Sequence, residues 1–223
     1  MVKGLDTFQK YFKDYEEQYV LIGGAACDIL FESNEVNFRA TRDLDMVLII
    51  EALTPEFGEK FWKFIVDGKY RNKATNGSNP QFYRFDKPED DEFPKMIELF
   101  CRSDFKLKNA KGITPIHIDD EVSSLSAILL NDDYYKALLN GKEVRNGLSV
   151  LRPEYIILFK AKAYLDLKRQ KDLGEKVDSS DIKKHKKDVL RIASELMLEK
   201  VEELPIAVDA DIHSFIDLLE QEP

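Results

Sequence analysis

The chain has few of the residues that build metal centres or disulfides. Its 223 residues include 2 cysteines, Cys27 and Cys101, which lie far apart in apolar segments, and 3 histidines that share no ligand spacing. Neither a disulfide nor a zinc site is therefore expected. No run approaches the roughly 18 apolar residues of a membrane span, and the N-terminus lacks an apolar signal core. These absences predict a cytoplasmic protein with no membrane partner.

Several common enzyme motifs are also missing. The sequence contains no Gly-x-x-x-x-Gly-Lys-Ser/Thr loop, no Gly-x-Gly-x-x-Gly fingerprint and no Gly-x-Ser-x-Gly elbow. The net charge of -9 argues against a protein that coats nucleic acid without specificity. Residues 160–191 nevertheless hold 11 Lys/Arg against 6 Asp/Glu, a local balance of +5 that leaves -14 for the rest. This stretch either holds a polyanion locally or forms a solvated helix surface.

The hydrophobic pattern predicts a mixed α/β (α+β) core over residues 1–150, followed by a helical C-terminal region over 151–223. In the core we expect helices at 3–17, 25–31 and 55–68, and strands at 19–22, 43–50, 81–85 and 95–101, with further strand candidates at 113–118 and 124–130. A helix from Pro153, a linker at 173–180 and a second helix after it complete the prediction. No internal repeat interrupts this order.

Gly23 and Gly24 lie where the strand at 19–22 is expected to turn into a helix. Without a Cβ, backbone at such a place approaches a phosphate closely, and the helix N-terminus offers free N–H groups. A purely structural tight turn explains the two glycines equally well.

Three carboxylates point to metal-assisted phosphate chemistry. Asp43 and Asp45 open an apolar strand, and because residues i and i+2 share a face, their side chains lie together. Two convergent carboxylates suit Mg²⁺, which takes its other oxygens from water and phosphates. Glu98 lies inside the apolar run 96–100, where an ionised side chain is costly to bury unless it is paired or binds a metal. The alternative for Glu98 is a solvent-facing position on a half-exposed sheet.

Residues 18–101 resemble the nucleotidyltransferase superfamily related to DNA polymerase beta. The segment from Arg39 to Asp45, Arg-Ala-Thr-Arg-Asp-Leu-Asp, is similar to the Arg-x-Thr-x-Asp-Leu-Asp signature of small prokaryotic members, including the AbiEii-type toxins of type IV toxin-antitoxin systems. The resemblance implies a palm-like sheet that binds a nucleoside triphosphate and Mg²⁺. Two departures stand out: many members have serine after the first glycine, where this chain has Gly24 and then Ala25, and the interval from Gly24 to Asp43 is long.

The resemblance also implies roles for individual residues. Asp43 and Asp45 would hold the metal that bridges the triphosphate, and Glu98 would join them in holding a second Mg²⁺ ion. Arg39 and Arg42, on the approach to the metal strand, are candidates for phosphate contacts. Each of the two arginines is also consistent with a plain surface position.

Further candidates for nucleotide binding lie in the C-terminal helices. Lys160 matches a lysine of AbiEii-like proteins, and the segment from Lys184 to Asp188 is similar to their charged Lys/Asp segment. Asp188 is the better polar candidate in this segment, and a helical ion pair with Lys184 explains it as well. His185 falls on the apolar stripe of its helix, which favours a core histidine over a catalytic base.

The first interpretation is a Mg²⁺-dependent nucleotidyltransferase that moves a nucleoside monophosphate to an acceptor hydroxyl, with RNA as acceptor and an antitoxin as partner in a toxin-antitoxin system. The second is a transferase of the antibiotic-modifying type that acts on a small molecule. The third is a catalytically silent module that binds a nucleotide or a protein partner.

Overall fold

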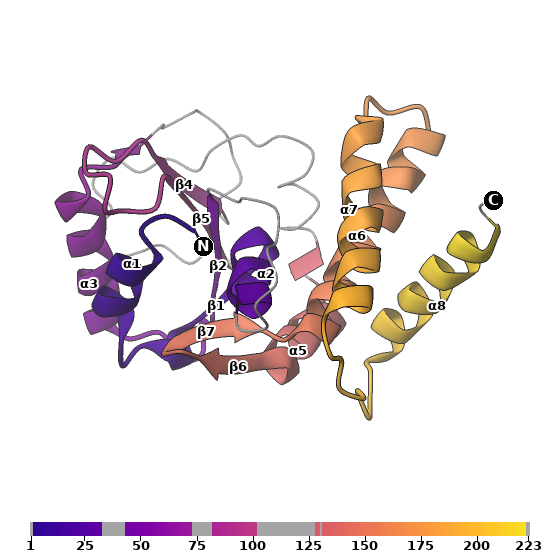
Figure 1. Ribbon diagram of the computed structural model, residues 1–223, viewed down its shortest axis with the longest axis horizontal. Coiled ribbons are helices and arrows are strands. Elements are labelled where there is room, and N and C mark those ends of the chain that lie inside the picture. The colour runs from indigo at the N-terminus through magenta and orange to yellow at the C-terminus, as the bar shows by residue number, and fades with distance from the viewer. Residues whose placement is uncertain (1, 33–42, 73–81, 102–127, 130, 222–223) are drawn as a thin grey trace. The chain divides into compact units, whose positions relative to one another are not determined.

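The computed structural model describes residues 2–32, 43–72, 82–101, 128–129 and 131–221 (Figure 1). Arg39, Arg42 and the strand candidate at 113–118 lie outside these ranges. The chain forms two compact units. The first contains Met1–His117 and Lys142–Leu151, and the second contains Ile118–Gly141 and Arg152–Pro223. The sequence predicted a domain boundary after residue 150, and the last segment of the first unit ends at Leu151. Residues 118–141, which the sequence assigned to the α/β core, belong to the second unit.

The first unit is built on a mixed sheet, as the sequence predicted. Over the described residues the sheet has seven strands in the order β3-β4-β5-β2-β1-β7-β6. The neighbours β1 and β7 run parallel, as do β2 and β5, and the other neighbours run antiparallel. The strands are β1 Tyr19–Ile22, β2 Asp43–Leu48, β3 Arg71–Asn72, β4 Phe82–Asp86, β5 Met96–Phe100, β6 Lys142–Arg145 and β7 Leu148–Leu151.

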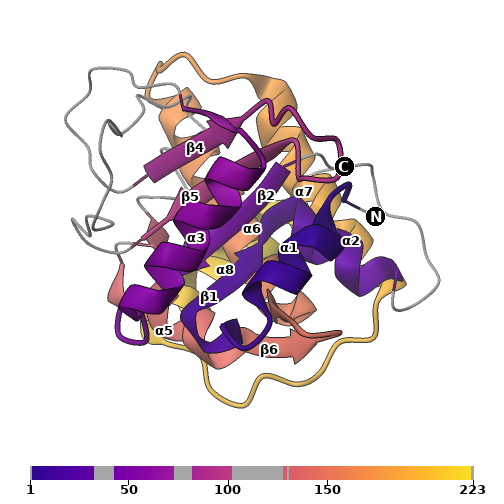
Figure 2. The same ribbon diagram turned by 90° about the vertical axis from the view of Figure 1, so that its left-hand side faces the viewer.

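Helices cover both faces of this sheet. Helices α1 (Leu5–Phe12) and α3 (Pro55–Asp67) lie on one side of the strands, and α2 (Gly23–Glu32) lies on the other (Figure 1). Figure 2 looks onto the α1 and α3 side. A short 3-10 helix, Glu16–Gln18, joins α1 to β1. The predicted helix at 3–17 is therefore too long: α1 ends at Phe12, because Lys13 leaves the helical region with ψ 134°, and Asp14 follows with a left-handed φ of 76°.

The α1 and α3 side holds an aromatic core. The Tyr19 ring meets Phe8 edge-on, with 5.5 Å between the ring centroids, and the core continues through Phe12, Phe57, Phe61 and Phe64, all of which are buried. Edge-to-face packing of this kind adds to the free energy gained by burying the rings. The aromatic face therefore anchors the sheet and leaves the opposite face for polar residues.

Strand register decides which side chains point away from the aromatic core. Leu48 pairs with Tyr19, so it shares the aromatic face, and Met46 and Leu44 follow at intervals of two. Asp43 and Asp45 must then point to the other face, where α2 packs. The alternation of buried Leu44 and Met46 with half-buried Asp43 and Asp45 agrees with this assignment.

The second unit is helical. Its elements are α5 (Asp132–Gly141), α6 (Pro153–Asp172), α7 (Ser179–Glu195) and α8 (Ile206–Gln221). A buried cluster of Ala161, Tyr164, Val189 and Phe215 joins α6, α7 and α8. The strand predicted at 124–130 is wrong at Ile128 and Leu129, which are helical, and its other residues lie outside the described ranges. Within the described ranges no helix is long and apolar enough to cross a membrane.

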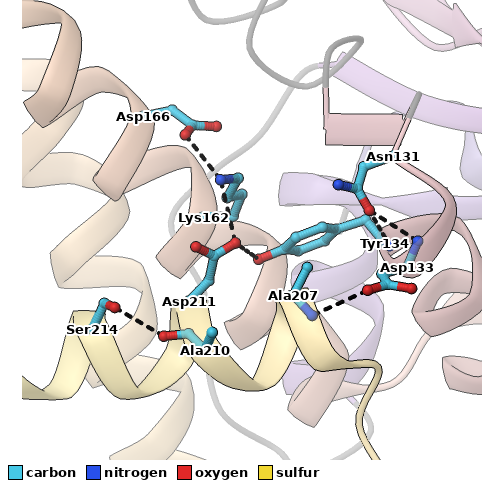
Figure 3. Close-up of polar contacts among 9 residues, drawn as sticks. All are labelled: Asn131, Asp133, Tyr134, Lys162, Asp166, Ala207, Ala210, Asp211 and Ser214. Atoms are coloured by element: carbon cyan, nitrogen blue, oxygen red, sulfur yellow. Dashed lines mark hydrogen bonds and ion pairs between the residues drawn. The ribbon is translucent and has the colours of Figure 1, made fainter.

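Polar contacts fasten α8 to α5 and α6 (Figure 3). The Tyr134 hydroxyl donates a hydrogen bond to Asp211 at 3.0 Å, and Lys162 lies 3.2 Å from Asp211 and 3.1 Å from Asp166. Asp133 accepts from the backbone N–H of the second residue of α8 at 3.0 Å. Burial and the nearby Asp211 raise the pKa of Tyr134. Burial alone would lower the pKa of Lys162, but the two carboxylates outweigh it and raise that pKa.

Candidate functional site

Gly23 places a carboxylate against the start of α2. It follows β1 directly as the first residue of α2, with φ +62°, a conformation that side-chain-bearing residues rarely adopt. A Cβ built on Gly23 would lie 2.1 Å from Oδ2 of Asp45. The helix predicted from Ala25 thus begins two residues earlier, and Gly23 and Gly24 lie in its first turn. The lack of a side chain at Gly23 is what lets Asp45 approach the helix.

Register aligns the predicted carboxylates across neighbouring strands. Ile22, the last residue of β1, pairs with Asp45 of β2, and Asp45 pairs with Glu98 of β5. Partners in register on adjacent strands point to the same face and lie about 5 Å apart at their backbones. Asp43 lies two residues before Asp45 and shares that face. Asp43, Asp45 and Glu98 therefore lie on the α2 face of the sheet.

Glu98 is the most buried member of this set. It is 7% exposed, which excludes the solvent-facing alternative. Its Oε1 accepts from Nε of Arg84 at 2.7 Å and lies 2.5 Å from Nη2 of the same guanidinium. Arg84 pairs with Glu98 in the β4–β5 register and so occupies the next position along the same face. A buried carboxylate requires such a partner, because an unpaired charge is costly to remove from water.

Sequence reasoning missed Arg84. It lies in the run Phe-Tyr-Arg-Phe of β4, and alternation alone shows that its side chain and that of Phe85 point to opposite faces. Phe85 belongs to the aromatic core, since its ring centroid lies 5.5 Å from that of Phe61. A signal was therefore present: an arginine opposite a core aromatic, on a strand next to one that carries an isolated glutamate.

The donor set fits a divalent cation in part. Asp43 and Asp45 are half-buried carboxylates on one strand face, which is the chemistry that Mg²⁺ binds. In the part of the chain that the structure describes, no group of three or more His, Cys, Asp or Glu side chains is arranged to hold a metal ion. Glu98 is level with Asp45, but its carboxylate faces Arg84. The two aspartates therefore form the candidate metal site, and three-carboxylate binding stays a prediction.

The start of α2 supplies the chemistry for an anion beside these aspartates. The first N–H groups of a helix have no partner within the helix, and the helix dipole places positive charge there. In α2 this end carries two glycines, so its first two residues have no side chains of their own. A phosphate and a divalent cation could accordingly be held side by side.

The remaining predicted site residues belong to the second unit. Nζ of Lys160 lies 2.7 Å from Oδ2 of Asp188, and both side chains are buried, with 9% and 6% exposed. This pair joins α6 to α7 and gives Asp188 a buried partner on the neighbouring helix, while its ion pair with Lys184 stays a prediction. Lys184 is half-buried on α7, and His185 is buried at 7% exposure, as its place on the apolar stripe predicted. Nucleotide binding by Lys160, Lys184 and Asp188 stays a prediction.

Together these observations define a mixed α/β unit with a carboxylate-bearing sheet face beside a glycine-rich helix start. No protein-family model matches the chain, and no curated protein matches it. Among solved structures, the chain is similar to one described as an antigenic nucleotidyltransferase-like protein from Paracoccidioides brasiliensis. The two share 15% identity over 95% of this chain and 85% of that one, with a TM-score of 0.45. A likeness at this level carries no information about activity, so the function must come from this chain's own residues.

Proposed function

We propose that the first unit is a Mg²⁺-dependent nucleotidyltransferase. One observation carries this proposal: the Asp43 and Asp45 carboxylates share a strand face, and Asp45 lies directly against the glycine-rich start of α2. A metal site next to a phosphate site is the minimum that phosphoryl chemistry on a nucleoside triphosphate requires. Such transfer depends mainly on positioning and charge neutralisation, which fixed carboxylates and helix N–H groups provide.

Each residue of the site would have its own role in the reaction. Gly23 and Gly24 would bind a phosphate oxygen through backbone N–H groups, and Asp43 and Asp45 would hold Mg²⁺, which supplies charge neutralisation at the triphosphate. The acceptor hydroxyl oxygen forms a new bond to the α-phosphorus, and the bond to the β-phosphate oxygen breaks. Pyrophosphate leaves with that electron pair, and the hydroxyl proton passes to water. Glu98 would complete a site for a second ion.

RNA as the acceptor, and a toxin role with a cognate antitoxin, rest on the AbiEii-like segment from Arg39 to Asp45. The positive balance of residues 160–191 supports a polyanionic acceptor, because Lys and Arg neutralise phosphates. Arg39, Arg42, Lys160, Lys184 and Asp188 are the residues that would contact nucleotide or acceptor in this proposal. A small-molecule acceptor is the alternative for the same chemistry.

A second candidate, a nucleotide-binding module without catalysis, is favoured by one observation. Arg84 holds the carboxylate that would bind the second ion. If the pairing of Arg84 with Glu98 persisted when a nucleotide was bound, the unit would bind the triphosphate without transferring its nucleoside monophosphate.

The test is transfer of label from each α-³²P nucleoside triphosphate, with Mg²⁺, to total cellular RNA and separately to a small-molecule pool. Asp45→Asn should reduce transfer by about a hundredfold or more, because it removes a metal ligand. Asp67→Asn, the same change on α3 at the opposite face of the sheet, is the matched control and should transfer normally.

The two pools separate the candidates. Label on RNA that requires Asp45 supports a polynucleotide acceptor, and label on small molecules supports the alternative. Nucleotide binding that requires Asp45, without transfer to either pool, supports the silent module. Absence of both binding and transfer rejects the site.

A further inference from the structure

We propose that Arg84 is a positioning residue that acts as an internal counter-ion for Glu98, occupying this carboxylate until a second divalent ion replaces it. The proposal rests on the proposed function, since it concerns the same metal site. It assigns a role to a residue on β4 that the carboxylate pattern did not include. Glu98 then becomes a metal ligand only in the complex with nucleotide and metal.

The order of strands places Glu98 between two competing partners. Arg84, Glu98 and Asp45 are paired in register on β4, β5 and β2, which are adjacent in the sheet (Figure 2). On one side Oε1 of Glu98 accepts from Arg84 at 2.7 Å, and on the other side lies the strand that carries Asp43 and Asp45. A carboxylate in this position exchanges one cation for another by a change of side-chain rotamer, without movement of the strand.

Charge explains why the exchange matters. Asp43, Asp45 and Glu98 carry three negative charges when ionised, and Arg84 offsets one of them. A second divalent ion would require the negative charge of Glu98, which Arg84 neutralises. A bound triphosphate would help to recruit that ion, because its phosphates supply further oxygen ligands.

The burial of Glu98 explains why the metal-free protein needs Arg84. The side chain of Glu98 is 9% exposed and that of Arg84 26%. An ionised carboxylate so deep in the sheet is stable only with a cation beside it. Arg84 therefore keeps the strand face folded in the metal-free protein, and the same contact keeps Glu98 away from a metal that arrives alone.

The experiment measures Mn²⁺ binding to the nucleotide-free protein by calorimetry and by electron paramagnetic resonance. Arg84→Met should bind Mn²⁺ about tenfold more tightly than wild type or more, because a positive charge is removed close to the metal and a carboxylate is released. Arg84→Lys keeps the charge and should stay close to wild type. Arg145→Met, which removes an arginine paired with Glu143 on β6, is the matched control and should leave the affinity unchanged.

A double variant attributes the gain to the released carboxylate. Arg84→Met combined with Glu98→Gln should lose most of the tighter binding, since the amide is a poor metal ligand. Equal Mn²⁺ affinity of Arg84→Met and wild type, in a folded protein by circular dichroism, overturns the proposal. If Arg84→Met is unfolded without metal, folding on addition of Mn²⁺ supports the exchange, and failure to fold in Mn²⁺ overturns it.

Asp45→Asn separates this proposal from the proposed function. If that variant binds Mn²⁺ as wild type does, the metal site is misplaced and the proposed function fails with it. If Asp45→Asn abolishes binding while Arg84→Met matches wild type, the metal site stands and only the role of Arg84 is rejected.

Discussion

Replacing Gly23 by alanine should destabilise the first unit and displace the Asp45 carboxylate. Gly23 has φ +62°, and a Cβ there would lie 2.1 Å from Oδ2 of Asp45. The backbone is fixed by the turn from β1 into α2, so the strained φ remains, and the clash is relieved only if the Asp45 side chain turns to another rotamer. The substitution therefore tests the contact on which the proposed phosphate and metal site depends.

The expected change in the free energy of unfolding is the sum of three contributions. A left-handed backbone costs a residue with a side chain about 1–2 kcal/mol. Turning Asp45 out of its rotamer costs a further 0.5–1.5 kcal/mol or so. Reduced freedom of the unfolded chain returns roughly 0.5 kcal/mol. The free energy of unfolding should therefore fall by about 1–3 kcal/mol.

The assay is urea unfolding followed by circular dichroism, with Gly58→Ala as the control. Gly58 lies inside α3, where an added Cβ would meet nothing within 4 Å, and it has no positive φ. The same chemical change there should stabilise the protein by about 0.5–1 kcal/mol, because alanine favours the helix. Opposite signs at the two glycines are the expected result. A Gly23→Ala protein as stable as wild type would refute the reasoning.

Three further predictions concern other contacts. Thr54→Ala removes the hydroxyl that caps α3, which accepts from a backbone N–H at 3.3 Å, and should cost about 1 kcal/mol in urea unfolding. Lys160→Met leaves Asp188 as a buried charge without this lysine and should cost about 3–5 kcal/mol, most of it recovered by adding Asp188→Leu; a single variant as stable as wild type would contradict this. The hydrogen bond to Asp67, with burial and the carboxylate charge, raises the pKa of Tyr11 to about 12, so this pairing's stabilisation should be complete below the ordinary tyrosine pKa and decline as pH rises toward 12. Asp67→Asn should move the Tyr11 absorbance titration back toward the ordinary value, and an unmoved titration would exclude Asp67 as its cause.

The sequence predicted the parts of the sheet that carry the candidate site. Strands β1, β2 and β5 are runs of apolar residues, and buried strands in mixed sheets have this composition. Asp43 and Asp45 were assigned to one face from spacing alone, because the period of a strand is fixed by its geometry. Glu98 was singled out because an acid within an apolar run requires a partner.

Alternation showed which face of β4 carries Arg84, but its pairing with Glu98 depends also on register between strands. Residues 87–95 join β4 to β5, and a connection of that length does not fix which residues face each other. A shift of one residue would have turned Arg84 to the aromatic face. The contact between Gly23 and Asp45 escaped prediction for a similar reason, since it requires β1 and β2 to pair with Ile22 opposite Asp45.

Helix α5 was missed because its apolar residues form a short pattern. Tyr134, Tyr135 and Leu138 are buried, but the helix has only ten residues and no long stripe. A local signal did exist: Oδ1 of Asn131 accepts from the backbone N–H groups of Asp133 and Tyr134, at 2.9 and 3.3 Å. Asparagine followed by two aspartates is typical of a helix start.

The parallel pairing of β1 with β7 has a consequence for synthesis of the protein. Leu21 pairs with Val150, so β1 gains this neighbour only after the ribosome has added nearly 130 further residues. Until then β1, whose four residues Tyr19–Ile22 are all buried in the finished fold, is an edge strand with open backbone groups. A nascent or truncated chain that ends before β7 would present that edge to other chains and should be prone to aggregation.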